Sequence, residues 1–283
     1  MRLTRAIKLI RSLSDDMTEW MLAGHVRAEY RSLPDRRTIE GILRLDSASP
    51  IEDFSFRLSE ALHQFRGSFD GLAWELTHLG NVSPCKPKQV YFPMEWDATR
   101  WKDASIRLDS MPVNLLSRVE DVQPFNQSRP DLDVLATLAR LSNSDKHQDL
   151  VSANLAPSFA SNIGLRVDSD DHPDPDAPDI RFDFPEAPAL VDGAVQIRAV
   201  AGRPVTYSTD SALTLSGLDW QVMDRPHGRL SLEHVIDALC LQLPMITNYV
   251  RNGGVVLSRL PVGEHQNGWS GTMRVFGVSD EDR

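Results

Sequence analysis

The sequence predicts an α+β protein with a helical N-terminal half and an antiparallel, β-rich C-terminal half. In several segments of the first half, apolar residues recur every three or four positions, which is the period of a helix. In the second half they alternate every two positions, which is typical of strands. We therefore expect a helical domain over residues 1–165 with an inserted β-hairpin (24–46), an acidic Pro-rich linker or loop over 166–178, and a β-rich region over 179–283 that contains a long Pro-kinked helix (231–251).

The first half begins with a helix over residues 3–22, predicted by an apolar stripe at spacings of three and four. The runs HVRAEYRSL and RRTIEGILRL indicate the hairpin, with a short polar loop around Pro34 and Asp35. A longer helix follows over residues 54–79. The next segment, VYFPMEW, is expected to be a short strand or extended, because the residue before Pro93 is biased away from helix.

Two further helices complete this half. One covers residues 112–122 and is begun by Pro112 near its first turn. The other lies in LDVLATLARL and runs into SNSDKHQDL, where Ser142 and Asp145 have the spacing of a capping box. Such a box would restart the helix after a kink.

The second half opens with VDSDDHPDPDAP, whose repeated Asp and Pro predict a solvated linker. A calcium loop is the alternative, but the glycine and final Glu of an EF-hand are missing. The runs DIRFDF, GAVQIRAV, RPVTYSTD and ALTLSGLDW predict strands over residues 179–221. Ser231 is a good N-cap for the helix that follows, and Pro244 should kink it. VVLSRL and TMRVFGV are expected to be strands near the C-terminus.

Composition limits the classes of function. The net charge of −10 argues against a protein that grips duplex nucleic acid by phosphate neutralisation alone. The acidity is uneven, however, because residues 1–150 hold 20 Lys and Arg against 22 Asp and Glu, which leaves room for a local basic groove. Cys85 and Cys240 are far apart, so neither a disulfide framework nor a cysteine zinc site is indicated. We expect a cytoplasmic protein with no membrane span, cofactor or bound metal.

The helix around LHQFRGSFDGLAWEL carries the most suggestive polar residues. Projected at about 100° per residue, its core stripe lies beside a narrower row, which we call the border row: His63, Arg66, Asp70 and Trp74. Arg66 and Asp70 are four residues apart, so an ion pair along the helix is geometrically easy. One interpretation is a structural ion pair at the edge of a helical bundle. The other is a functional site that includes His63.

A functional site needs a second element facing the border row, and SNSDKHQ is the candidate. It brings Asp145, Lys146 and His147 together. Histidine can act as a general acid or base near neutral pH, and Arg or Lys can stabilise charge on a phosphate oxygen, so these groups suit metal-independent phosphodiester cleavage. The alternative is that these residues only cap the end of a helix.

Four short motifs resemble those of a known family. LHQFRGSFDGLAW, YFPMEW, QPFNQSRPDLDVLATL and LSNSDKH are similar, in the same order, to the HNLRSALDHLAW-like, FPI-like, QPY-like and NxDKHR-like motifs of a family of uncharacterised bacterial proteins frequent in actinobacteria. The similarity spans roughly residues 1–150. Asp70 also matches the family motif, which implies that its pairing with Arg66 is a shared feature.

The helix motif of that family, an Arg followed by four residues and a His, is similar to the signature of HEPN domains. Many HEPN domains are RNases that act through an Arg and a His at a dimer interface. The resemblance implies that Arg66 is the catalytic arginine, but Gly71 stands where the histidine would be. His63 or His147 would then have to supply the acid and base.

Two functions follow. The first is a HEPN-like nucleic-acid-directed protein, including a metal-independent RNase of a defence or toxin system that binds RNA or a nucleotide as a homodimer. Its catalytic residues would be Arg66, His63 and His147, with binding by Asp70, Trp74, Asp145 and Lys146. The second is a non-enzymatic binding or assembly protein in which Arg66 and Asp70 are structural. Gly71 and the acidic charge favour the second.

Overall fold

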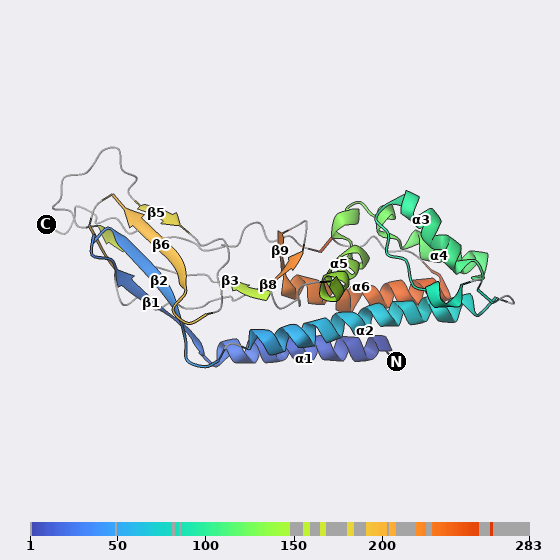
Figure 1. The fold of residues 1–283 in the computed structure, drawn as a ribbon, viewed down its shortest axis with the longest axis horizontal. Coiled ribbons are helices and arrows are strands. Elements are labelled where there is room, and N and C mark those ends of the chain that lie inside the picture. Colours follow the sequence, from blue (N-terminus) through green and yellow to red (C-terminus); the bar gives the residue numbers. More distant parts are fainter. Residues whose placement is uncertain are drawn as a thin grey trace. The chain divides into compact units, whose positions relative to one another are not determined.

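A computed structural model gives the fold of the chain (Figure 1). It describes residues 2–48, 50–80, 83–84, 86–147, 155–158, 165–167, 180–183, 191–202, 204–207, 219–224, 228–254 and 261–262. The chain divides into two compact units. Unit 1 comprises residues 1–17, 52–155 and 221–266, and unit 2 comprises residues 18–51, 156–220 and 267–283. The predicted α+β class is confirmed.

The helices are α1 (Arg2–Leu22), α2 (Ile51–Thr77), α3 (Ala98–Ser105), α4 (Val113–Asp121), α5 (Val134–His147) and α6 (Leu232–Asn252), with short 3-10 turns η1 (Pro87–Gln89), η2 (Ile106–Leu108), η3 (Pro124–Asn126) and η4 (Pro130–Leu132). The strands are β1 (Val26–Ser32), β2 (Thr38–Leu45), β3 (Leu155–Ser158), β4 (Leu165–Val167), β5 (Ile180–Asp183), β6 (Val195–Ala201), β7 (Val205–Tyr207), β8 (Asp219–Asp224) and β9 (Gly228–Ser231).

Unit 1 has a helical core in which the long helices bury their apolar stripes. The stripe predicted for α2 is fully confirmed, since all of these residues are buried: Leu62, Phe65, Phe69, Leu72, Ala73 and Leu76. The same is true of α6, where Val235, Leu239, Leu243, Ile246 and Val250 are buried and the helix packs against α4 and α5. Ser231 caps α6 as predicted, and Pro244 lies inside the helix. Burial of these stripes is the main force that holds helices of this length in place.

Three segments of unit 1 show how local predictions fared. Residues 90–96 form no strand, which leaves the extended alternative, and side chains bind the backbone of Phe92 and Glu95. Helix α3 was not predicted, although Asp97 is a good N-cap whose carboxylate accepts a hydrogen bond from the Thr99 backbone N–H. Helix α5 also runs unbroken to His147. Ser142 is buried inside α5 and donates its hydroxyl to the Ala139 carbonyl, so it does not begin a new helix.

Unit 2 is built on an antiparallel sheet of order β1-β2-β6-β5. The predicted hairpin supplies β1 and β2, and its loop is closed by Asp35, whose carboxylate accepts bonds from the backbone N–H groups of Arg37 and Thr38. One sheet face buries Ile39, Ala199, Ala201 and Val205, with Tyr30, Ile180 and Phe182 packed around them. The opposite face is strongly charged, because side chains alternate along each strand.

The two units interleave along the sequence, whereas the sequence predicts consecutive regions. Pairing of β2 with β6 joins residues 38–42 to residues 195–200, and packing of α6 on α4 and α5 joins the third segment of unit 1 to the second. Most of the expected 166–178 linker and both expected C-terminal strands lie outside the described residues. None of the described helices combines the length and the continuous apolar character that a bilayer span requires.

Candidate functional site

Arg66 and Asp70 bind the backbone of a single residue, Phe92. The Phe92 N–H donates to Asp70 Oδ1 at 3.0 Å, and Arg66 Nη2 donates to the Phe92 carbonyl at 3.0 Å. The two side chains also face each other, with Arg66 Nε 3.5 Å from Asp70 Oδ1. Together they satisfy both polar groups of a buried residue that belongs to no sheet. The predicted ion pair along the helix is therefore present. The same two side chains also hold a loop by binding its backbone.

The loop that they hold is also packed against α2 and bonded to a second segment of the chain. Phe92 is fully buried and meets Phe69 edge-on, with ring centroids 4.9 Å apart. Further along, the Glu95 N–H donates to Gln123 Oε1 at 3.0 Å, and Gln123 Nε2 donates to the Val119 carbonyl at 2.8 Å. We call residues 90–96 the clamped segment. The helix motif, the FPM motif and the QPF motif of the sequence thus meet in one hydrogen-bonded scaffold.

The side chains of the border row differ in how far they are buried and in what they contact. The Arg66 side chain is mostly buried, with an exposed fraction of 18%. His63 is exposed. Trp74 is 44% exposed and packs on the ring of His78 at a centroid distance of 4.2 Å. His78 Nδ1 also lies 2.7 Å from the Trp74 carbonyl oxygen. Trp74 therefore contacts the residue one turn further along the chain, directly after the end of α2.

The second predicted element, SNSDKHQ, is only partly described. The α5 backbone extends through Asp145, Lys146 and His147, but their side chains lie outside the described residues. The expected approach of His147 to Arg66 therefore stays a prediction.

Gly71, the position of the histidine in the resembling motif, has room for a side chain. A Cβ built there would meet only Arg2 Nη1, at 3.9 Å. The glycine is therefore not required by crowding within the described residues.

Two arginine–aromatic pairs lie on and beside the clamped segment, and the sequence did not predict them. The Arg107 guanidinium lies over the Tyr91 ring at 4.8 Å, and the Arg100 guanidinium lies over the Trp96 ring at 5.1 Å. Trp96 is 45% exposed. We call Tyr91, Trp96, Arg100 and Arg107 the arginine–aromatic surface. The signal available in the sequence was an aromatic residue four positions before an arginine, at 96 and 100, beside a helix start.

The stretch of chain that carries these pairs is rich in basic residues. Lys86, Lys88 and Lys102 are exposed on it. Residues 86–107 hold five Lys and Arg against three Asp and Glu, although the whole chain is acidic. The local basic groove that the charge count permits stays a prediction.

The described residues contain no group of three or more His, Cys, Asp or Glu side chains arranged to hold a metal ion. No family model, no curated protein and no solved structure matches this chain.

Proposed function

We propose that this protein is a non-catalytic binding protein that contacts single-stranded RNA through the arginine–aromatic surface. The observation that carries the proposal is the position of Arg66 and Asp70 on the Phe92 backbone. A guanidinium that stabilises a phosphate during cleavage has to face the substrate, whereas that of Arg66 is mostly buried and already bonded to protein. Arg66 and Asp70 are then the scaffold that fixes the binding surface.

The choice of single-stranded RNA rests on the chemistry of the surface. Exposed aromatic rings stack with unpaired bases, and guanidinium groups both stack with bases and neutralise phosphates. The rings of Tyr91 and Trp96 already accept a planar cation on one face. The nearby lysines add charge for the backbone of the nucleic acid. The acidic remainder of the chain should make binding modest in affinity and strongly dependent on salt.

Two exposed tryptophans allow a matched test. Trp96 and Trp74 have nearly equal exposed fractions, 45% and 44%, but only Trp96 belongs to the arginine–aromatic surface. We expect Trp96→Ala to weaken binding of a fluorescently labelled single-stranded RNA at least about tenfold, consistent with the loss of one base stack. Trp74→Ala should change it less than twofold. Fluorescence anisotropy measures both, with circular dichroism to check folding.

The opposite ranking would move the site to the border row. Loss of binding in Trp74→Ala alone would contradict the proposal, and so would a wild-type protein that binds no RNA at low salt.

A HEPN-like ribonuclease of a defence or toxin system, acting as a homodimer, remains the second candidate because Arg66 stands at the matching position of the helix motif. In that case purified protein degrades a mixed RNA pool and Arg66→Ala does not. Under our proposal the pool stays intact with wild-type protein. Equal degradation by wild type and Arg66→Ala would indicate contamination.

A further inference from the structure

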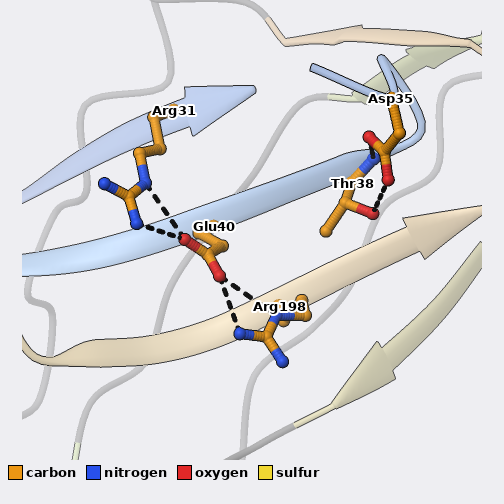
Figure 2. A network of polar contacts seen from close by, with 5 residues as sticks. All are labelled: Arg31, Asp35, Thr38, Glu40 and Arg198. Carbon is orange, nitrogen blue, oxygen red and sulfur yellow. Dashed lines mark hydrogen bonds and ion pairs between the residues drawn. The ribbon is translucent and has the colours of Figure 1, made fainter. Parts of the chain in front are cut away.

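The charged face of the unit 2 sheet contains a row of three side chains that crosses three strands (Figure 2). Arg31 on β1 lies opposite Glu40 on β2, and Glu40 lies opposite Arg198 on β6. Both arginines bind the shared Glu40 carboxylate through the same pair of nitrogen atoms, Nε and Nη2. Arg31 donates from Nε and Nη2 to Oε2 at 3.0 and 2.8 Å, and Arg198 donates from Nε and Nη2 to Oε1 at 3.1 and 2.7 Å.

Burial in this row is uneven. The Glu40 side chain is only 5% exposed, whereas Arg31 and Arg198 are 57% and 47% exposed. The buried Glu40 carboxylate therefore holds in place two guanidinium groups that reach the surface. Among the described residues, neither arginine donates a hydrogen bond from Nη1, and Nη2 of each carries a second N–H group besides the one that binds Glu40.

The row carries a surplus positive charge. One carboxylate neutralises one of the two arginines, and neighbouring acidic residues on this face are already paired with other arginines. Asp183, which lies opposite Arg198 on β5, pairs with Arg181 at 3.1 Å, and Glu29 pairs with Arg44 at 2.6 Å. The remaining charge of about +1 is held in a fixed position at the surface, which is a favourable place for an anion.

We propose that Arg31 and Arg198, held by Glu40, form a binding site for a phosphate group. The two Nη2 atoms donate hydrogen bonds to the two oxygens of the Glu40 carboxylate. They therefore lie within roughly 8 Å of each other, which is the sum of two hydrogen-bond lengths and the distance between the carboxylate oxygens. A tetrahedral phosphate can span that distance and accept from two guanidinium planes at once. The shared chemistry is that of inorganic phosphate or a phosphomonoester on a small molecule. The site belongs to unit 2 and is independent of the RNA surface proposed in unit 1.

The test is calorimetric titration of the full chain with inorganic phosphate and, separately, with phenyl phosphate, against chloride at equal ionic strength. We expect saturable binding that weakens at least about tenfold in Arg198→Gln. The matched control is Arg27→Gln, which removes an exposed arginine of β1 that pairs with Asp46 outside the row, and it should change binding less than twofold. Tighter binding of phenyl phosphate identifies a phosphomonoester as the ligand, and tighter binding of inorganic phosphate identifies the free ion.

A second measurement needs no variant and covers the case in which Arg198→Gln does not fold. Phenylglyoxal modifies accessible arginines, and mass spectrometry reads each position. Phosphate should protect Arg31 and Arg198 of the wild type but leave Arg27 and Arg181 reactive. Equal protection of all four arginines, or wild-type titrations in which phosphate and chloride behave alike, would overturn the proposal.

Discussion

Arg66 and Asp70 hold the clamped segment by binding both backbone groups of Phe92. The spacing of Arg66 and Asp70 predicts an ion pair, and the pair is present. Their main partner, the backbone of Phe92, lies 26 and 22 residues further along the chain. No local pattern encodes that contact, because the partners are far apart in the sequence and meet only in the folded chain.

Substitution of Asp70 separates the hydrogen bond from the charge. Asp70→Ala leaves the buried Phe92 N–H without its acceptor, and we expect a loss of about 1 to 3 kcal/mol in the free energy of unfolding. Asp70→Asn keeps a side-chain oxygen at the same place and should cost less. Chemical denaturation of both variants measures the difference. If Asn costs as much as Ala, the charge beside Arg66 matters and the hydrogen bond does not.

The buried carboxylate of Glu40 predicts a dependence of stability on pH. Hydrogen bonds from Arg198 and then from Arg31 lower its pKa below the ordinary value of 4.5. Because the pKa is lower in the folded state, this stabilisation is complete above the unfolded-state pKa and is lost as pH falls through the folded-state pKa. We expect Glu40→Gln to cost about 1 to 3 kcal/mol at pH 7.

The difference between wild type and Glu40→Gln should shrink as pH falls below about 4. Urea denaturation at several pH values measures it. Glu29→Gln is the control, since Glu29 lies on the same face and pairs with Arg44 but is exposed, so its effect should be much smaller. A Glu40→Gln cost that is independent of pH would show that packing, and not the charge of Glu40, is responsible.

Helices and strands are predicted well from the sequence where a local pattern of apolar residues decides them. The hairpin, α2 and α6 follow from period-two and period-3.6 patterns, and their buried faces are the predicted ones. Helix α3 is short and only two of its residues are buried, so its pattern is weak. The strands that pair with the hairpin are not predicted by a local pattern. Pairing of β2 with β6 joins residues about 157 positions apart, and a strand pattern does not name its neighbour.

Two glycines, one inside α2 and one after its end, should respond to alanine substitution in opposite ways. Gly67 lies inside the helix, and a Cβ there would have no other atom within 4 Å. Gly67→Ala should therefore raise the free energy of unfolding by about 0.5 to 1 kcal/mol. At Gly80 a Cβ would lie 2.2 Å from the Ser110 carbonyl oxygen, so Gly80→Ala should destabilise the protein. Thermal denaturation ranks the two variants, and destabilisation by Gly67→Ala would refute the stated geometry of α2.

At the scale of the whole molecule, unit 1 cannot be cut from the chain as one consecutive piece. Its last segment, α6, packs against α4 and α5. Polar contacts reinforce this packing, because the Tyr249 hydroxyl donates to Asp121 at 2.7 Å, Arg118 donates to the Arg251 carbonyl, and Arg251 pairs with Glu75. The sequence places a helix at residues 231–251 correctly but assigns it to the β-rich region, since periodicity identifies a buried face and not what covers it.

A fragment of residues 1–165, the predicted helical domain, should therefore not fold cooperatively. It lacks the buried stripe of α6, of which the five large residues predicted from the sequence are each worth about 1.5 to 3 kcal/mol, and roughly 10 kcal/mol in total is comparable to the whole stability of a domain. We expect a broad thermal transition by circular dichroism and strong binding of a hydrophobic dye. A peptide of residues 228–254 added in trans should restore part of the cooperative transition, because it supplies the missing face. A variant of that peptide with Leu239→Asp, which places a charge in the buried stripe, should not. If the fragment alone melts as sharply as the full chain and within a few degrees of it, α6 is dispensable and the helical core is complete without it.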